Sequence, residues 1–144
     1  MSPVANSVPK RAKTASAPRS DAALYLGKAT EFSEAAKHAL RQSQHDAAML
    51  NAIHAAISAA DAVTVGLSGL RSTDSDHQRV ADLLLQVGRS GSLTTHVRQL
   101  RVLLSQKNMV EYESGRATAA EASDAVSRAK RIVDWARETV ASGK

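Results

Sequence analysis

The chain has no cysteine, and its 144 residues include only four aromatic residues, three prolines and seven glycines. Without cysteine it can form no disulfide and no thiolate metal site. Its five histidines, at positions 38, 45, 54, 77 and 96, form no HxxxH or HExxH pair, so the sequence predicts neither a metal site nor a cofactor. It also has no glycine-rich phosphate loop and no nucleophile elbow. The motifs by which many enzymes are recognised are therefore missing.

Long apolar runs are also scarce. The one stretch that approaches the length of a membrane span is the alanine-rich segment 47–65, and it carries His54 and Asp61. We interpret this segment as the core helix of a soluble protein. No stretch has the apolar centre of a secretory signal. We therefore expect a cytoplasmic protein with no membrane partner.

The net charge of +5 is unevenly distributed. Residues 1–20 contain four basic residues (Lys10, Arg11, Lys13, Arg19) and no acidic one, which leaves fifteen basic against fourteen acidic residues elsewhere. The segment 1–19 is predicted to be a disordered basic tail. Such a tail can add non-specific affinity for nucleic acid by releasing counterions.

The rest of the chain, residues 20–142, shows helical periodicity and no strand-like alternation. Helices are expected from Ser20 to about residue 42, from Asp46 to residues 66–69, from Ser75, from Ser92 to before Gly115, and from Thr118 onwards. Asp46 is expected to cap the second helix, and Thr118 with Glu121 forms a capping box. Gly27 lies inside the first helix, where its cost of about 1 kcal/mol is tolerable if another helix approaches closely. The fold class is therefore all-α: an up-and-down bundle of about five helices.

The second of these helices is interrupted by polar residues on one face. Asn51, His54, Ser58 and Asp61 follow one another at spacings of three, four and three residues. Buried polar groups need partners. This polar stripe is therefore expected either to meet another polar stripe or to line a site.

The fourth expected helix changes character in its last turns. Its apolar face continues onto Lys107 and Glu111, which are spaced to pair, and Asn108 and Tyr112 are also four residues apart. If this end meets the polar stripe, one cluster forms from His54, Asp61, Lys107, Asn108, Glu111 and Tyr112, which we take as candidate catalytic or binding residues. The alternative is that the helix end leaves the core and Lys107 extends to water.

Two further sets of residues are candidates. Arg71 and His77 bracket the loop RSTDSDH and could hold a phosphate and act as acid or base; alternatively, the loop only caps the next helix. Arg98 and Arg101 are candidates for contact with RNA or a partner, or they belong to a solvated face. Asn51 on the polar stripe is a candidate for the same role.

The chain resembles the HEPN-domain family of α-helical bundles, found in prokaryotic toxin–antitoxin and defence systems. The resemblance rests on LGKATEFSEAAKHAL, NAIHAAISAADAV, DHQRVADLL and RQLRVLLSQKNMVEY, and covers roughly Asp21 to Ala141. It is greatest to compact HEPN-like proteins of actinobacteria, which implies a bacterial protein. It also implies a homodimer and RNA, or a companion protein of the antitoxin type, as partner.

Many HEPN proteins are metal-independent endoribonucleases, whose motif is an arginine, often a polar neighbour, and a histidine four to six positions further on. The similar segment here is KNMVEY: Lys107 stands for the arginine, Asn108 is the polar neighbour, and Glu111 or Tyr112 stands where histidine is expected. Lysine lacks the planar fork of arginine, and the loss of histidine removes the group best suited to proton transfer.

Three hypotheses follow. We expect a HEPN-like module that binds RNA or a protein and has a degenerate ribonuclease motif. The second hypothesis is an active endoribonuclease in which His54 or His77 replaces the missing histidine. The third is a purely structural interaction module whose polar stripes satisfy one another in the core.

Overall fold

The computed structural model describes residues 13–88 and 91–143. Within them, a short 3-10 helix η1 (Arg19–Asp21) precedes α2 (Ala22–Arg41), α3 (His45–Ser68), α4 (Gln78–Val87), α5 (Leu93–Tyr112) and α6 (Ala119–Ser142). Two three-residue strands, β1 (Thr14–Ser16) and β2 (Leu70–Ser72), complete the described fold. The predicted all-α bundle of five helices is confirmed.

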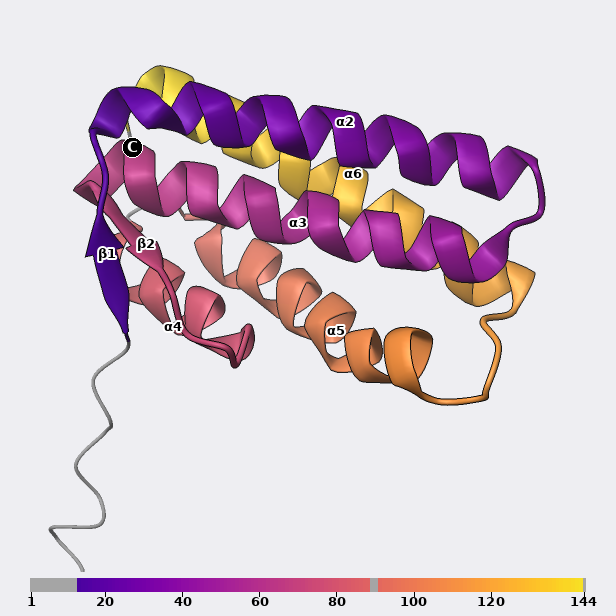
Figure 1. Cartoon of the computed structure of the whole chain (residues 1–144). Coiled ribbons are helices and arrows are strands. Elements are labelled where there is room, and N and C mark those ends of the chain that lie inside the picture. The colour runs from indigo at the N-terminus through magenta and orange to yellow at the C-terminus, as the bar shows by residue number, and fades with distance from the viewer. Residues whose placement is uncertain (1–12, 89–90, 144) are drawn as a thin grey trace, which may run out of the picture.

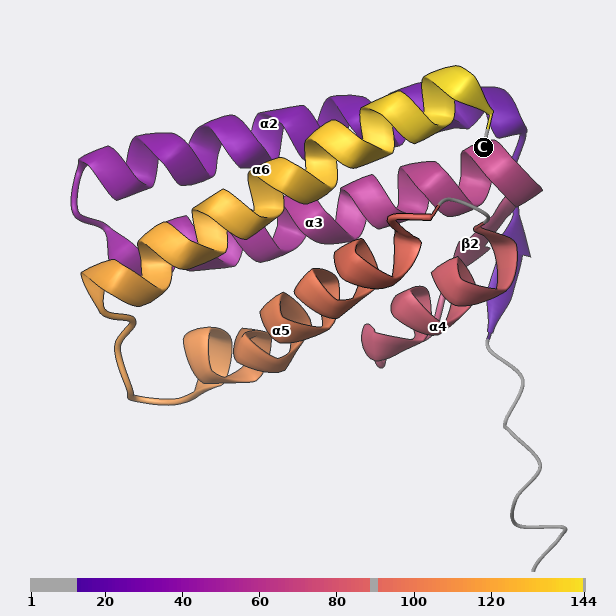
Figure 2. The same ribbon diagram turned by 180° about the vertical axis from the view of Figure 1, so that it is seen from behind.

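The central helix is α3, which contacts each of the other four α-helices. It forms an antiparallel hairpin with α2, while α6 lies across both, and α4 and α5 cover the remaining side (Figures 1 and 2). Fourteen of its residues are buried, and most of them are alanine or valine. These small side chains allow the neighbouring helices to approach α3 closely. Helix α3 is long and apolar enough to span a membrane. However, 67% of its most apolar 18-residue stretch is buried inside the fold, as in the core helix of a soluble protein.

Helices α2, α3 and α6 approach one another closely at Gly66 rather than at Gly27. A Cβ atom added to Gly66 would lie 3.3 Å from both the Ala22 Cβ on α2 and the Val140 Cγ2 on α6. A Cβ added to Gly27 would meet nothing within 4 Å. The condition stated for Gly27, a closely approaching helix, is therefore not met.

Strands β1 and β2 pair antiparallel, with Thr14 opposite Ser72 and Ser16 opposite Leu70. Gly69 makes this possible, because its φ of +70° ends α3 in the left-handed conformation and turns the chain directly into β2. In addition, the Arg19 Nε donates a hydrogen bond to the Gly66 carbonyl at 2.8 Å. The prediction of a disordered tail over 1–19 is therefore wrong for residues 14–16 and for Arg19, and its first twelve residues lie outside the described part of the chain.

Two capping predictions have different outcomes. The capping box of Thr118 and Glu121 is present at the start of α6. Asp46 does not cap α3, which begins one residue earlier at His45. Instead its carboxylate accepts hydrogen bonds from the Ala117 backbone N–H at 2.8 Å and from the Arg116 Nε at 3.1 Å. Asp46 therefore joins the start of α3 to the loop before α6.

Candidate functional site

His54 of the polar stripe on α3 lies beside the charged end of α5. The Lys107 Nζ donates a hydrogen bond to Glu111 Oε2 at 2.7 Å, and Glu111 Oε1 lies 4.0 Å from His54 Nε2. The side chains of Lys107 and Glu111 are each only 18% exposed. Helix α5 therefore does not simply leave the core at this end, and a cluster of three titratable groups joins it to α3.

His54 sits in a setting that disfavours its charged form. Its pKa is lowered, first by burial and then by the positive charge of Lys107, while Glu111 opposes the shift. The Phe32 ring on α2 packs beside the imidazole, with ring centroids 5.4 Å apart. His54 is therefore a neutral imidazole at pH 7, able to accept a proton. Glu111, in contrast, has a lowered pKa because Lys107 donates a hydrogen bond to it.

His77, immediately before α4, lies close enough to respond to the same charges. Burial lowers its pKa most, Lys107 lowers it further, and Glu111 and Asp76 oppose the shift. His77 lines two cavities. The first, of about 490 Å³, is also lined by Lys107, Asn108 and Tyr112 together with Ser75, Asp76, Gln78 and Leu104. The loop residue His77 and the charged end of α5 thus share one cavity.

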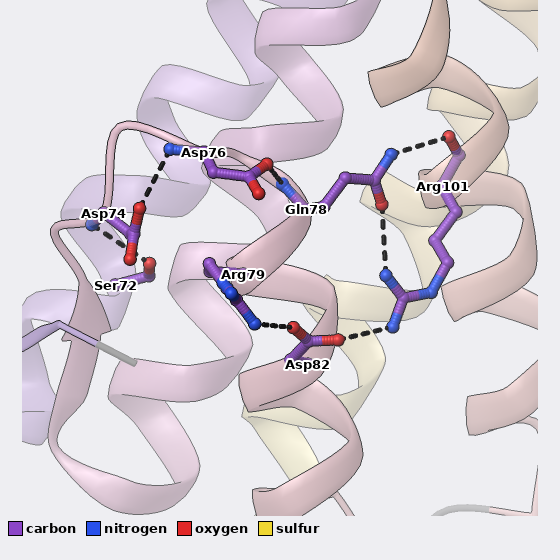
Figure 3. Close-up of polar contacts among 7 residues, drawn as sticks. All are labelled: Ser72, Asp74, Asp76, Gln78, Arg79, Asp82 and Arg101. Atoms are coloured by element: carbon purple, nitrogen blue, oxygen red, sulfur yellow. Dashed lines mark hydrogen bonds and ion pairs between the residues drawn. The ribbon is translucent and has the colours of Figure 1, made fainter. Parts of the chain in front are cut away.

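The loop that carries His77 is held by a succession of short polar turns (Figure 3). The Asp74 backbone N–H donates to Ser72 Oγ at 3.4 Å, the Asp76 N–H donates to Asp74 Oδ1 at 3.0 Å, and the Gln78 N–H donates to Asp76 Oδ1 at 3.0 Å. Asp76 thus satisfies an N–H in the first turn of α4, as one of the two sequence interpretations expects. The same loop also places His77 on the cavities, so the two interpretations are compatible.

The second cavity, of about 270 Å³, contains Asp61 and Arg71 beside His77. Burial raises the pKa of Asp61 to about 7, and the charges of Arg71 and Lys28 oppose this rise. Asp61 therefore does not share the cavity that Lys107, Asn108 and Tyr112 line. The predicted single cluster of six residues is wrong for Asp61, which lines the second cavity. Lys107, Asn108 and Tyr112 line the first cavity, and His54 and Glu111 join the cluster through Lys107 without lining either cavity.

The remaining candidates lie away from these cavities. Asn51 donates from its side chain to the Ala47 carbonyl of its own helix at 2.9 Å. The Arg101 guanidinium donates to Asp82 Oδ1 at 2.7 Å and to Gln78 Oε1 at 3.1 Å (Figure 3). Arg98 is exposed on the surface of α5. Since Arg101 holds α5 to α4, its positive charge is largely used within the fold.

The other residues around the cavities could not be identified from sequence patterns. Ser72 and Thr73 line the second cavity because β2 and the turn after it lie there, and a three-residue strand has no recognisable period. Within residues 13–88 and 91–143, no group of three or more His, Asp and Glu residues is placed to hold a metal ion. The chemistry available is therefore that of imidazoles, carboxylates, a lysine, an arginine and an exposed tyrosine.

One family of known proteins matches the chain over the helical bundle. The HEPN domain family matches residues 22–139, which span α2 to α6. No curated protein matches the chain. Because the family match covers most of the chain, the protein belongs to the HEPN-domain family.

Proposed function

We propose that this HEPN domain binds single-stranded RNA in the first cavity, between the loop of His77 and the last turns of α5. The observation that carries the proposal is the convergence of Lys107, Asn108 and Tyr112 with His77 around a space of about 490 Å³. Its volume falls in the range of about 300–1,000 Å³ typical of ligand sites.

The lining residues supply the interactions that unpaired RNA needs. Tyr112 is 76% exposed, an unusual position for an aromatic residue, and its ring can stack against a base. Lys107 supplies positive charge for a phosphate. His77 and Asn108 can donate hydrogen bonds to phosphate or ribose oxygens.

Binding is favoured over cleavage by the way Lys107 is held. Its ammonium group is paired with Glu111 at 2.7 Å, so part of its charge is neutralised before any phosphate arrives. In addition, Glu111 or Tyr112 stands where the HEPN ribonuclease motif has histidine. These two features support a degenerate motif that retains affinity for RNA.

A second candidate function is metal-independent cleavage of RNA, favoured by the two imidazoles beside Lys107. His54 and His77 both have lowered pKa values, so either is neutral at pH 7 and able to take the proton of a ribose 2′-hydroxyl. The 2′-oxygen would then attack the adjacent phosphorus, while a second acid protonates the departing 5′-oxygen. Lys107 would stabilise the negative charge on the phosphate.

The third hypothesis, a bundle whose polar stripes only satisfy one another, is less well supported. Asp61 has no hydrogen bond or ion pair to its carboxyl group within the described part of the chain, although it is only 8% exposed. A purely structural stripe would be expected to pair this group.

A homodimer or a companion protein of the antitoxin type remains part of the proposal, because HEPN proteins commonly form such complexes. Sedimentation velocity tests whether the protein is a dimer.

The test is fluorescence anisotropy of a labelled single-stranded RNA with the full chain in the presence of EDTA. Lys107→Ala is expected to weaken binding about tenfold, the equivalent of about 1.4 kcal/mol, and to lower the salt dependence by about one counterion. The matched control is Lys130→Ala, because Lys130 forms the same i,i+4 ion pair on α6, with Asp134 at 2.8 Å. An equal loss in both variants, or no binding by the wild type, would contradict the proposal.

Two further arms of this experiment separate the alternatives. Gel analysis of the same mixtures detects cleavage, and cleavage that is lost in folded His54→Ala or His77→Ala would establish the ribonuclease. The double substitution Lys10→Ala/Arg11→Ala tests the N-terminal basic residues. If it abolishes binding altogether, those residues and not the cavity would be the RNA-binding element.

A further inference from the structure

The second cavity is a separate space that adjoins the first at His77. Asp61 and Ile57 of α3, Val80 of α4 and Arg71 of β2 contribute to its wall, with Ser72, Thr73 and Asp74. Its volume of about 270 Å³ lies just below the range typical of drug-sized ligands. The space therefore suits one small planar group better than a whole nucleotide.

Asp61 is the unusual residue of this cavity. It is 92% buried, since 8% of its surface is exposed, and its side chain lines the cavity. No hydrogen bond or ion pair reaches its carboxyl group from any residue that the structure describes. Buried polar side chains are nearly always paired in native proteins, and those left unpaired call for an explanation such as a catalytic role or a bound water or ion. In a cavity, a bound polar ligand can fill the same role.

Arg71 provides a positively charged hydrogen-bond donor that complements the acceptor Asp61. Its guanidinium lies over the Tyr25 ring, 5.9 Å from the ring centroid, and no ion pair holds it within the described part of the chain. Its charge nevertheless acts on Asp61. The wall of the cavity thus includes an acceptor, Asp61, and a donor, Arg71, with Ile57 and Val80 as apolar surface.

We infer that the second cavity receives one unstacked base of the RNA strand whose backbone occupies the first cavity, and that guanine fits it best. This inference rests on the proposed function. Guanine carries N–H donors on its Watson–Crick edge, which suit the Asp61 carboxylate, and the acceptors O6 and N7, which suit Arg71. His77, which lines both cavities, would lie between the base and the phosphate.

The test measures the affinity of the full chain for two labelled oligouridylates that differ only in one central residue, uridine or guanosine. The wild type is expected to bind the strand with guanosine about tenfold more tightly. In Asp61→Asn one of the two acceptor oxygens is replaced by an NH2 donor and the negative charge is lost, so the ratio of the two affinities is expected to fall to near one. Lys107→Ala is expected to weaken both strands by the same factor and so to preserve the ratio.

The possible failures are distinguishable. If the wild type binds neither strand, the proposed function fails and this inference fails with it. If both strands bind equally, or if Asp61→Asn keeps the preference, the inference fails while RNA binding stands. If guanosine monophosphate competes as strongly as the oligonucleotide, the ligand is a free nucleotide and the two cavities are not linked by one strand. The Asp61→Ala variant, checked for folding by circular dichroism, provides the same comparison with the side chain removed.

Discussion

Replacement of Asp61 by asparagine should stabilise the fold, and increasingly so as the pH rises. The pKa of Asp61 lies near 7 in the folded protein against an ordinary value of 3.8. Between these values the folded state holds a proton that the unfolded chain has released. The free energy of unfolding therefore falls as the pH rises from about 4 to about 7, and this contribution is constant above pH 7.

The size of the effect follows from the same two values. At about 1.36 kcal/mol for each pKa unit, the interval from 3.8 to about 7 corresponds to a penalty of about 4 kcal/mol above pH 7. Asparagine cannot ionise, so it avoids this penalty. Near pH 4 the protonated acid and the amide are similar in polarity and size. The free energy of unfolding of Asp61→Asn minus that of the wild type should thus rise by about 4 kcal/mol between pH 4 and pH 8.

Urea unfolding across this pH range measures the difference directly, because the midpoint and slope give the free energy in water. The matched control is Asp124→Asn, an exposed aspartate paired with Arg128 at 2.6 Å. Asp124→Asn should change the free energy of unfolding by less than about 0.5 kcal/mol at every pH. A difference for Asp61→Asn that is flat with pH would refute the conclusion that the Asp61 carboxyl is buried without a partner.

Three further changes have expected outcomes. Glu111→Gln should strengthen RNA binding several-fold in the anisotropy assay, because it leaves the charge of Lys107 uncompensated; weaker binding would show that Glu111 itself contacts the ligand. Asp46→Ala should lower the free energy of unfolding by about 1–3 kcal/mol, since the N–H of Ala117 loses its acceptor, and an unchanged urea midpoint would contradict this. Gly27→Ala should raise the melting temperature, with a gain of up to about 1 kcal/mol, because the added methyl group meets open space; a lower melting temperature would reveal a contact at this surface in the assembled protein.

The helices could be predicted because their signals are local. Periodic apolar residues and the Thr118–Glu121 capping box define α6 within a single window of sequence. The two strands could not, because each is three residues long and Thr14 pairs with Ser72 across more than fifty residues of intervening chain. Neither segment alternates over enough residues to be recognised as a strand.

The candidate site was predictable in part for a similar reason. Helical spacing places His54 and Asp61 on one face of α3, and Lys107 with Glu111 on one face of α5. Spacing does not determine where the two helices cross, and the crossing brings His54 near Glu111 while Asp61 faces the second cavity. The spacing of Arg71 and His77 makes His77 a candidate, but the fact that it lines both cavities depends on how β2 and the following turns direct the loop between the helices.

The pairing of β1 with β2 has a consequence for how the protein can be shortened. The Thr73 N–H donates to the Lys13 carbonyl at 2.9 Å, so the beginning of the described chain is fastened to the loop that lines the second cavity. A truncation that ends before Lys13 leaves this fastening intact and removes the basic residues Lys10 and Arg11. A truncation that extends through Ser16 also releases β2, and with it the loop that sets the position of His77. Loss of RNA binding after the longer truncation would therefore reflect a displaced cavity wall as much as missing positive charge.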